Sequence, residues 1–155
     1  MAGYRGGPLA TAYAASKFAV EGLSEALAPE VAPSRVRVIS VAPGTFLIQF
    51  LAGFPQPAAG LSSACADGPV AAALARFEAK GGKQSGDPDK AAERVVELVD
   101  GSNMGNGFRE RGFGTVLQVF LGKDCYGAAT LKSQQICEDI QSSQEVAYST
   151  DFSEG

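Results

Sequence analysis

The stretch that decides the fold runs from the pentapeptide Y-A-A-S-K at residues 13–17 to the dipeptide Pro43-Gly44. The Ala-rich run Ala12–Ala28 has apolar residues at helical spacing and predicts a helix, which Pro29 is expected to end or kink. The β-branched run Val36–Val41 predicts a mostly buried strand. Helix, short turn and strand in this order are typical of an α/β fold, in which ligands bind at the carboxyl ends of the strands. The apolar face of the helix is expected at Ala12, Ala15, Ala19, Leu23 and Ala26.

Tyr13 and Lys17 are a candidate acid/base pair, because residues four positions apart lie on one face of a helix. A phenol ordinarily ionises near a pKa of about 10, and a neighbouring ammonium group favours the ionised form. Such a pair suits proton transfer near neutral pH. The same spacing also arises often by chance. The alternative interpretation is a packed tyrosine beside a lysine whose aliphatic stem lies along apolar surface.

Beyond a Pro- and Gly-rich segment at residues 45–70, the chain again alternates between helices and a strand. The pattern predicts a short helix over Val70–Lys80 that stops at Gly81-Gly82, a helix from Pro88 to Gly101 with Asp87 as its N-cap, a strand over Thr115–Leu121 and a last helix from Asp124. The second of these helices is expected to gather its apolar side chains on one face at Ala92, Val95, Val96 and Val99.

The segment Tyr13–Gly44, with Y-A-A-S-K-F-A-V-E-G-L-S-E-A-L and V-R-V-I-S-V-A-P-G, resembles the short-chain dehydrogenase/reductase family. The likeness continues more loosely through G-D-P-D-K-A-A at 86–92 and F-L-G-K-D at 120–124. It implies the C-terminal half of a doubly wound, Rossmann-like parallel sheet, with about two strands and three to four helices. Residues 1–141 are then a partial dehydrogenase domain, and residues 142–155 are a polar and loose C-terminal tail.

The resemblance also implies roles for single residues. Tyr13 exchanges the proton with the substrate oxygen, and Lys17 assists it and hydrogen-bonds the nicotinamide ribose. The turn after the first strand approaches the nicotinamide, and Gly44 allows close backbone contact there. Where the family has a threonine that holds the carboxamide, this chain has Ile48, and Thr45 is not an obvious substitute. The implied catalytic residues are Tyr13 and Lys17, and the implied cofactor-binding residues are Tyr13, Lys17, Pro43, Gly44, Thr45 and Phe46.

The family's N-terminal half, with its Gly-rich dinucleotide-binding turn and its catalytic serine, has no counterpart in residues 1–155. The glycines Gly101, Gly105 and Gly107 copy the spacing of that turn, but a helix precedes them in place of a strand, so we interpret them as a loop. The resemblance therefore implies a truncated oxidoreductase for an alcohol or carbonyl substrate that uses NADP or NAD, with NADP placed ahead. Little or no activity is expected of the isolated chain. The alternative is a non-catalytic remnant or an interaction and dimerisation module.

The composition of the chain argues against several classes of function. The 155 residues are 45% hydrophobic with a net charge of −4 and no basic cluster, which argues against nucleic acid as a partner. No apolar run reaches the roughly 18 residues of a membrane span, and the lack of histidine removes His-based triads and most metal sites. Three cysteines without a C-x-x-C spacing or a signal peptide predict reduced thiols in the cytoplasm. The expected partner is a small molecule, with a homo-oligomer as an option.

Overall fold

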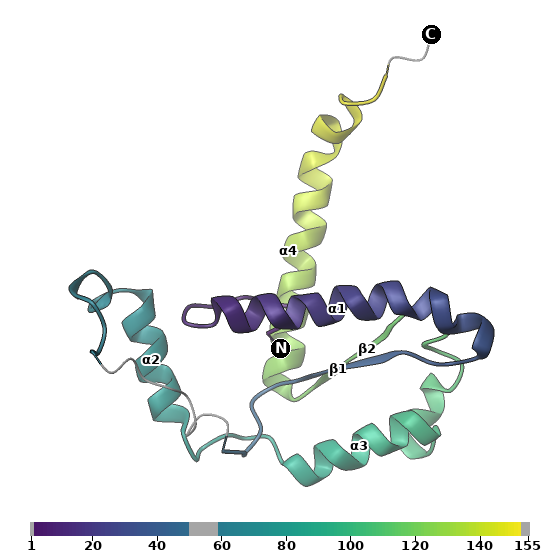
Figure 1. The fold of residues 1–155 in the computed structure, drawn as a ribbon, viewed down its shortest axis with the longest axis horizontal. Helices are drawn as coiled ribbons and strands as arrows, with labels where there is room; N and C mark the ends of the chain where they lie inside the picture. The colour runs from purple at the N-terminus through teal and green to yellow at the C-terminus, as the bar shows by residue number, and fades with distance from the viewer. Residues whose placement is uncertain (1, 50–58, 153–155) are drawn as a thin grey trace.

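Two parallel strands run between helices in the computed structural model, which describes residues 2–49 and 59–152 (Figure 1). Strand β1 (Ile39–Pro43) pairs with β2 (Leu117–Leu121), so that the first residues of the two strands face each other, as do the last. In the view of Figure 1, α1 (Thr11–Val31) and α3 (Pro88–Asp100) lie on either side of these strands. The parallel pair and its helices confirm the predicted α/β fragment.

The remaining elements follow the predicted order, with one correction near the C-terminus. Helix α2 spans Pro69–Lys80, and α4 spans Lys123–Tyr148 and projects away from the rest of the molecule (Figure 1). The prediction of a loose chain from residue 142 was therefore wrong for residues 142–148, which continue the helix with exposed side chains. The division into a domain over 1–141 and a tail stays a prediction. Among the described residues, short 3-10 segments cover Ala32–Ser34, Ser63–Cys65 and Asn103–Phe108.

The junction between α1 and β1 lies further along the chain than predicted. Helix α1 passes through Pro29 and ends only at Val31, because proline close to a helix end disturbs few backbone bonds. The amide of Val36 still bonds the carbonyl of Val31 at 3.5 Å, so this residue belongs to the turn and not to the strand. The first ladder-like bond joins the amide of Val38 to the carbonyl of Gly112 at 2.9 Å. Strand β1 consequently begins at Ile39.

Helix α1 faces the sheet with a different side from the one predicted. Its buried residues are Ala14 and Ala28, whereas Leu23 on the predicted apolar face is 66% exposed. Small alanine side chains let a helix approach its neighbours closely, which explains why they carry the buried contacts here. The larger apolar side chains of α1 remain on the surface; they include Phe18, Val20, Leu23 and Leu27.

Helix α3 has the predicted caps. The carboxylate of Asp87 accepts hydrogen bonds from the amides of Asp89 (3.0 Å) and Lys90 (3.3 Å), and Gly101 ends the helix with a φ of 73°. This left-handed conformation favours glycine. The predicted apolar face is exposed at Val96 and Val99, and the buried residues of α3 are Glu97 and Leu98. The sequence pattern thus identified the helix and its ends but not its buried side.

Arg37 ties the start of β1 to the end of α3. Its guanidinium donates hydrogen bonds to the carbonyls of Leu98 (3.1 Å) and Val99 in α3, and to that of Phe108 (3.3 Å) in the following 3-10 segment. These carbonyls have no partner inside their own helices, because the last turn of a helix leaves them free. One side chain therefore closes the C-terminal end of α3.

The glycines at 101, 105 and 107 lie at or just after the end of α3, and Gly105 is packed closely against that helix. A Cβ on Gly105 would overlap the carbonyl oxygen of Glu97 and lie 2.8 Å from the amide nitrogen of Leu98. By contrast, nothing lies within 4 Å of a Cβ on Gly107. The segment is a close backbone contact after a helix, in line with its interpretation as a loop.

We expect Gly105→Ala to lower the free energy of unfolding by about 1–3 kcal/mol, because backbone atoms of α3 must shift to make room for the methyl group. Gly107→Ala is the matched control and is expected to change it little. Urea unfolding followed by circular dichroism measures both values. Equal effects of the two substitutions would show that the contact at Gly105 is not tight.

Candidate active site

A cavity of about 390 Å³ lies between α1 and β1, with residues 2 and 3 also on its wall. Five of the six residues predicted to bind a cofactor line this cavity: Tyr13, Lys17, Pro43, Gly44 and Phe46. Ile48, which takes the place of the family's carboxamide-binding threonine, lines it as well. Residues near the start of α1 and residues at the end of β1 thus line the same cavity. The carboxyl end of a strand is where an α/β fold binds ligands.

Tyr13 and Lys17 lie on the same face of α1. The ammonium nitrogen of Lys17 is 5.5 Å from the centroid of the Tyr13 ring, a distance at which a cation and an aromatic face attract each other. The Tyr13 side chain is 45% exposed, so a small molecule can reach it. The predicted juxtaposition of the phenol, the amine and Gly44 is present in the structure.

Glu21 adds an acid to this wall that sequence reasoning did not single out. It lies one helical turn after Lys17, and its two carboxylate oxygens accept hydrogen bonds from the hydroxyl of Ser40 at 2.9 and 2.8 Å. The side-chain amide of Gln118 donates a further hydrogen bond to the Glu21 carboxylate at 3.3 Å. Because Ser40 and Gln118 are register partners in β1 and β2, Glu21 fixes the rotation of α1 against both strands. The repeated spacing of four residues from Tyr13 to Lys17 to Glu21 was the available signal.

The turn after β1 is held by the neighbouring strand and by α4. The amide of Gly44 donates a hydrogen bond to the carbonyl of Leu121 at 2.7 Å. The amide and the hydroxyl of Thr45 both donate to one carboxylate oxygen of Asp124, at 2.9 and 2.6 Å. Thr45 is accordingly the one predicted residue that is not among those lining the cavity. Its side chain is directed toward α4.

The hydrogen bonds from Thr45 also stabilise the ionised form of Asp124. Partial burial tends to raise the pKa of this carboxyl, but the bonds from the Thr45 hydroxyl and amide outweigh it, and the pKa lies below its ordinary value. The contact therefore contributes stability above the ordinary carboxyl pKa. That contribution is lost only as the pH falls through the lowered value.

Cys125 fixes the next position of α4 to the same strand. Its side chain is fully buried, and the thiol donates a hydrogen bond to the carbonyl of Ala42 at 3.2 Å. Burial raises the pKa of this thiol, which keeps it protonated and unreactive. The other cysteines, Cys65 and Cys137, are also free thiols.

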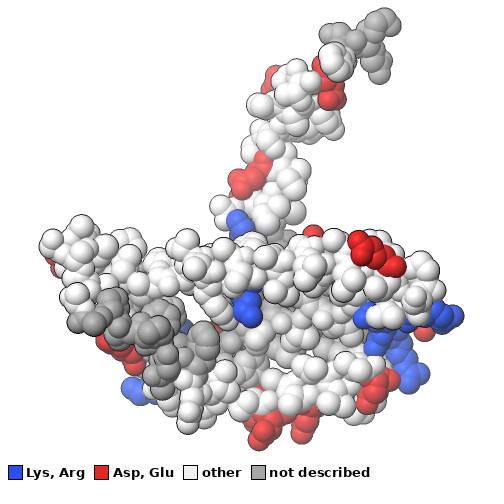
Figure 2. Space-filling view, viewed as in Figure 1, with Lys and Arg blue, Asp and Glu red and all other residues white. Residues whose placement is uncertain are grey.

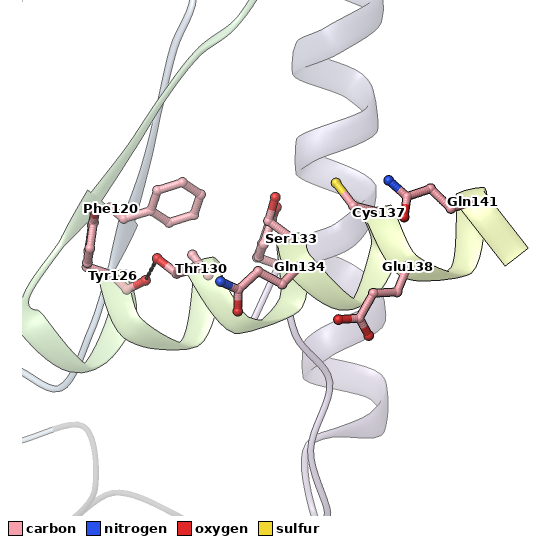
Figure 3. Close-up of a pocket in the computed structure, with 10 residues that line it drawn as sticks. Phe120, Tyr126, Thr130, Ser133, Gln134, Cys137, Glu138 and Gln141 are labelled. Carbon is pink, nitrogen blue, oxygen red and sulfur yellow. Dashed lines mark hydrogen bonds between the residues drawn. The ribbon is translucent and has the colours of Figure 1, made fainter.

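A second and larger cavity of about 530 Å³ lies along α4 beside β2 (Figure 3). Its aromatic wall includes Phe120, whose ring packs edge-on against that of Tyr4 with centroids 5.2 Å apart. The polar groups that line it are hydroxyls, amides, a thiol and the carboxyl of Glu138, and no lysine or arginine is among them. We assign the candidate active site to the cavity between α1 and β1, because Tyr13 and Lys17, the candidate acid/base pair, line it.

Charged side chains are distributed unevenly over the surface shown in Figure 2. On the face seen in Figure 2, basic side chains gather mainly at the end where α1 leads into β1, and acidic ones lie on α1, along α3 and on α4. Within residues 2–49 and 59–152, no three His, Cys, Asp or Glu side chains come together as metal ligands. A search of the same residues finds no helix with the length and apolar character needed to cross a membrane.

Comparisons with known proteins agree with the geometry. Residues 1–56 match the family model for short chain dehydrogenases. The chain is 47% identical over 64 residues to the oxidoreductase claN of Passalora fulva, which covers 41% of this chain and 28% of that protein. It is 57% identical over 44 residues to a 3-ketodihydrosphingosine reductase of Bacteroides thetaiotaomicron, which covers 28% of this chain and 16% of that protein.

The fold is shared with a solved structure over nearly the whole chain. A short-chain dehydrogenase from Streptomyces avermitilis superposes with a TM-score of 0.71 at 28% identity, over 97% of this chain and 50% of that one. The chain thus spans about half the length of this relative and a smaller part of the two curated ones. The matches confirm the resemblance to the short-chain dehydrogenase/reductase family and the predicted fold class.

Proposed function

We propose that this chain, with its short-chain dehydrogenase/reductase signature, carries the proton-transfer site of an NAD(P)-dependent oxidoreductase that interconverts a small carbonyl compound and its alcohol. The observation that carries the proposal is the shared cavity, in which the phenol of Tyr13, the amine of Lys17 and the Gly44 turn face one space. Two independent elements, α1 and β1, supply these groups. The oxidoreductase and reductase names of the matched proteins support the same reaction class.

Tyr13 and Lys17 divide the work of proton transfer in this proposal. The phenol of Tyr13 donates its proton to the substrate oxygen during reduction and accepts one during oxidation. The positive charge of Lys17, 5.5 Å from the ring centroid, stabilises the phenolate that remains. When bound, the nicotinamide supplies the hydride. The chain's own contribution is to orient the two reacting groups and to move the proton.

The residues present fit the nicotinamide end of such a cofactor. Gly44 offers a backbone surface without a side chain, and Lys17 is exposed on the opposite wall of the cavity, where its amine can donate to a ribose hydroxyl. The three glycines at 101, 105 and 107 do not fit the pyrophosphate end, because Gly105 is packed against the backbone of Glu97. We place NADP ahead of NAD as the cofactor.

The test uses the longest in-frame translation product that contains residues 1–155. We expect this product to oxidise NADPH or NADH when a panel of aldehydes and ketones is offered. The sequence upstream of residue 1 is the quicker observation: an in-frame Gly-rich turn and a serine would support the proposal, and an in-frame stop codon would contradict it.

A second candidate function is a non-catalytic interaction module. The observation that favours it is the exposed apolar side of α1, where Val20, Leu23 and Leu27 are 49%, 66% and 41% exposed. Side chains of this kind in a row are unusual on a free surface and mark contact with another protein surface. A stable oligomer of residues 1–155 in analytical ultracentrifugation, without turnover in any longer product, would favour this candidate.

A further inference from the structure

We infer that Asp124 is a positioning residue, whose carboxylate holds the Gly44-Thr45 turn in the conformation that forms the end of the cavity facing Tyr13 and Lys17. The inference rests on the proposed function, since the turn matters only if the cavity binds a nicotinamide group. It links the first turn of α4 to the candidate site through contacts made by residues 79 positions apart in the chain.

Two hydrogen bonds to one oxygen define the contact. The amide of Thr45 is 2.9 Å from Oδ2 of Asp124, and the hydroxyl of Thr45 is 2.6 Å from the same atom. Hydrogen bonds to an ionised acceptor are shorter and stronger than neutral ones. Because the amide is one of the two donors, the carboxylate fixes the backbone of the turn as well as the Thr45 side chain.

The chain leaves room for this carboxylate at the ends of both strands. Gly44 follows β1, and a Cβ there would lie 2.8 Å from Cγ of Asp124. Gly122 follows β2, and a Cβ there would lie 2.8 Å from Oδ1. Gly122 also has a φ of 97°, a conformation that L-residues rarely adopt. The carboxylate therefore sits between two glycines whose side-chain space it fills.

The start of α4 suits a negative charge and is itself fixed. Asp124 lies in the first turn of α4, where the free amides of a helix N-terminus favour an anion. The next residue, Cys125, bonds the carbonyl of Ala42 in β1. Since this turn of α4 is anchored to the strand on its own, the carboxylate of Asp124 is a rigid support for the loop that it contacts.

The consequence concerns Gly44. Its amide already bonds Leu121 at 2.7 Å, so the residue is held from the β2 side by one bond. The bonds from Asp124 hold the following residue and thereby set the direction of the chain toward Phe46, which also lines the cavity. Loss of the carboxylate frees this segment and leaves α1, with Tyr13 and Lys17, in place.

The test follows nicotinamide mononucleotide binding to the 155-residue chain by NMR, with backbone amides as site-resolved probes and millimolar ligand. Four variants are compared with the unchanged chain. Asp124→Ala removes the acceptor, and Thr45→Val removes only the hydroxyl donor at nearly constant shape. Thr45→Ser retains both donors. Asp139→Ala removes another carboxylate of α4, whose side chain is exposed.

In the unchanged chain we expect ligand-dependent shifts at the amides of Lys17 and Gly44. Asp124→Ala should lose the response at Gly44, weaken binding roughly three- to tenfold, and keep the response at Lys17. The affinity of Thr45→Val and its Gly44 response should lie between those of Asp124→Ala and the unchanged chain. Thr45→Ser and Asp139→Ala should match the unchanged chain. A purely structural role would change the responses of the two amides together.

The outcomes separate this inference from the proposed function. Binding by Asp124→Ala and Thr45→Val with unchanged affinity and an unchanged Gly44 response overturns the role of Asp124 and leaves the proposed function intact. Absence of any response in the unchanged chain overturns the nicotinamide site itself, and the positioning role with it. Circular dichroism of each variant identifies a chain that has lost its helices. If Asp124→Ala is unfolded by this measure, the comparison of Thr45→Val with Thr45→Ser tests the positioning role instead.

Discussion

Replacing Tyr13 by phenylalanine is expected to lower kcat about 10²–10⁴-fold in a translation product that turns over a carbonyl substrate with NADPH or NADH. The substitution removes only the oxygen that exchanges the proton and keeps the ring that packs beside Lys17. Cofactor affinity is expected to change little, because the backbone at Gly44 and the amine of Lys17 remain. Steady-state kinetics together with fluorescence titration of NADPH separate these two effects.

The control for this prediction is Tyr126→Phe. Tyr126 is 67% exposed on α4 and lines the larger cavity, away from Lys17. We expect its loss of a hydroxyl to leave kcat unchanged. Full activity of Tyr13→Phe would assign proton transfer to another group, and an equal loss in both variants would show a general effect of removing a tyrosine hydroxyl.

The 155-residue chain by itself is expected to bind NADPH far more weakly than a micromolar site. Most dinucleotide affinity comes from a Gly-rich turn that brings a helix N-terminus to the pyrophosphate. In the look-alike segment of this chain, Gly105 is packed against the backbone of α3. The bond from Lys17 to the ribose contributes about 1.5–3 kcal/mol. A Kd of 1 μM requires about 8 kcal/mol, so the remaining contacts are several kcal/mol short.

Calorimetric titration of the purified chain with NADPH measures this affinity. We expect no saturation in the micromolar range, and the same result with Gly107→Ala, which alters the look-alike segment without a clash. Saturable binding at low micromolar concentration would contradict the prediction. In that case loss of binding in Gly107→Ala would identify the segment at 101–107 as a phosphate site after all.

Local sequence signals predicted the elements well, because caps and breakers act over a few residues. Asp87 and Gly101 marked both ends of α3, and α2, predicted from Val70, begins one residue earlier at Pro69. The predicted start of β1, at Val36, was less accurate, because the strand begins at Ile39. The bonds that decide it come from Gly112 and Leu117, which are remote in sequence from Val38.

Periodicity showed which residues share a helix face but not what lies against that face. On α1 the predicted apolar face is exposed at Leu23, and on α3 at Val96 and Val99. Likewise, the polar composition after residue 142 predicts a loose tail. Its serine hydroxyls bond carbonyls of the preceding turn, as Ser142 does with Glu138 at 2.9 Å, and the helix continues.

The candidate site was predictable where its residues lie in one motif and unpredictable where they come from distant elements. The motif of Tyr13 and Lys17 and the Pro-Gly turn predicted six cofactor-binding residues, and five of these six line the cavity. The contacts of Glu21 with Gln118 and of Thr45 with Asp124 join residues 97 and 79 positions apart. No local pattern reports such pairs, because folding alone brings them together.

Transfer of deuterium from nicotinamide-deuterated NADPH or NADH to a carbonyl compound tests whether the protein reduces carbonyl compounds with a nicotinamide cofactor. The longest in-frame product that contains residues 1–155 is incubated with the labelled cofactor and a panel of aldehydes and ketones, and the alcohols are analysed by mass spectrometry. We expect an alcohol with deuterium bound to carbon, formed by the unchanged protein and not by a Tyr13→Phe, Lys17→Met double variant. Absence of deuterated alcohol with every carbonyl compound, from a folded protein, would contradict this expectation.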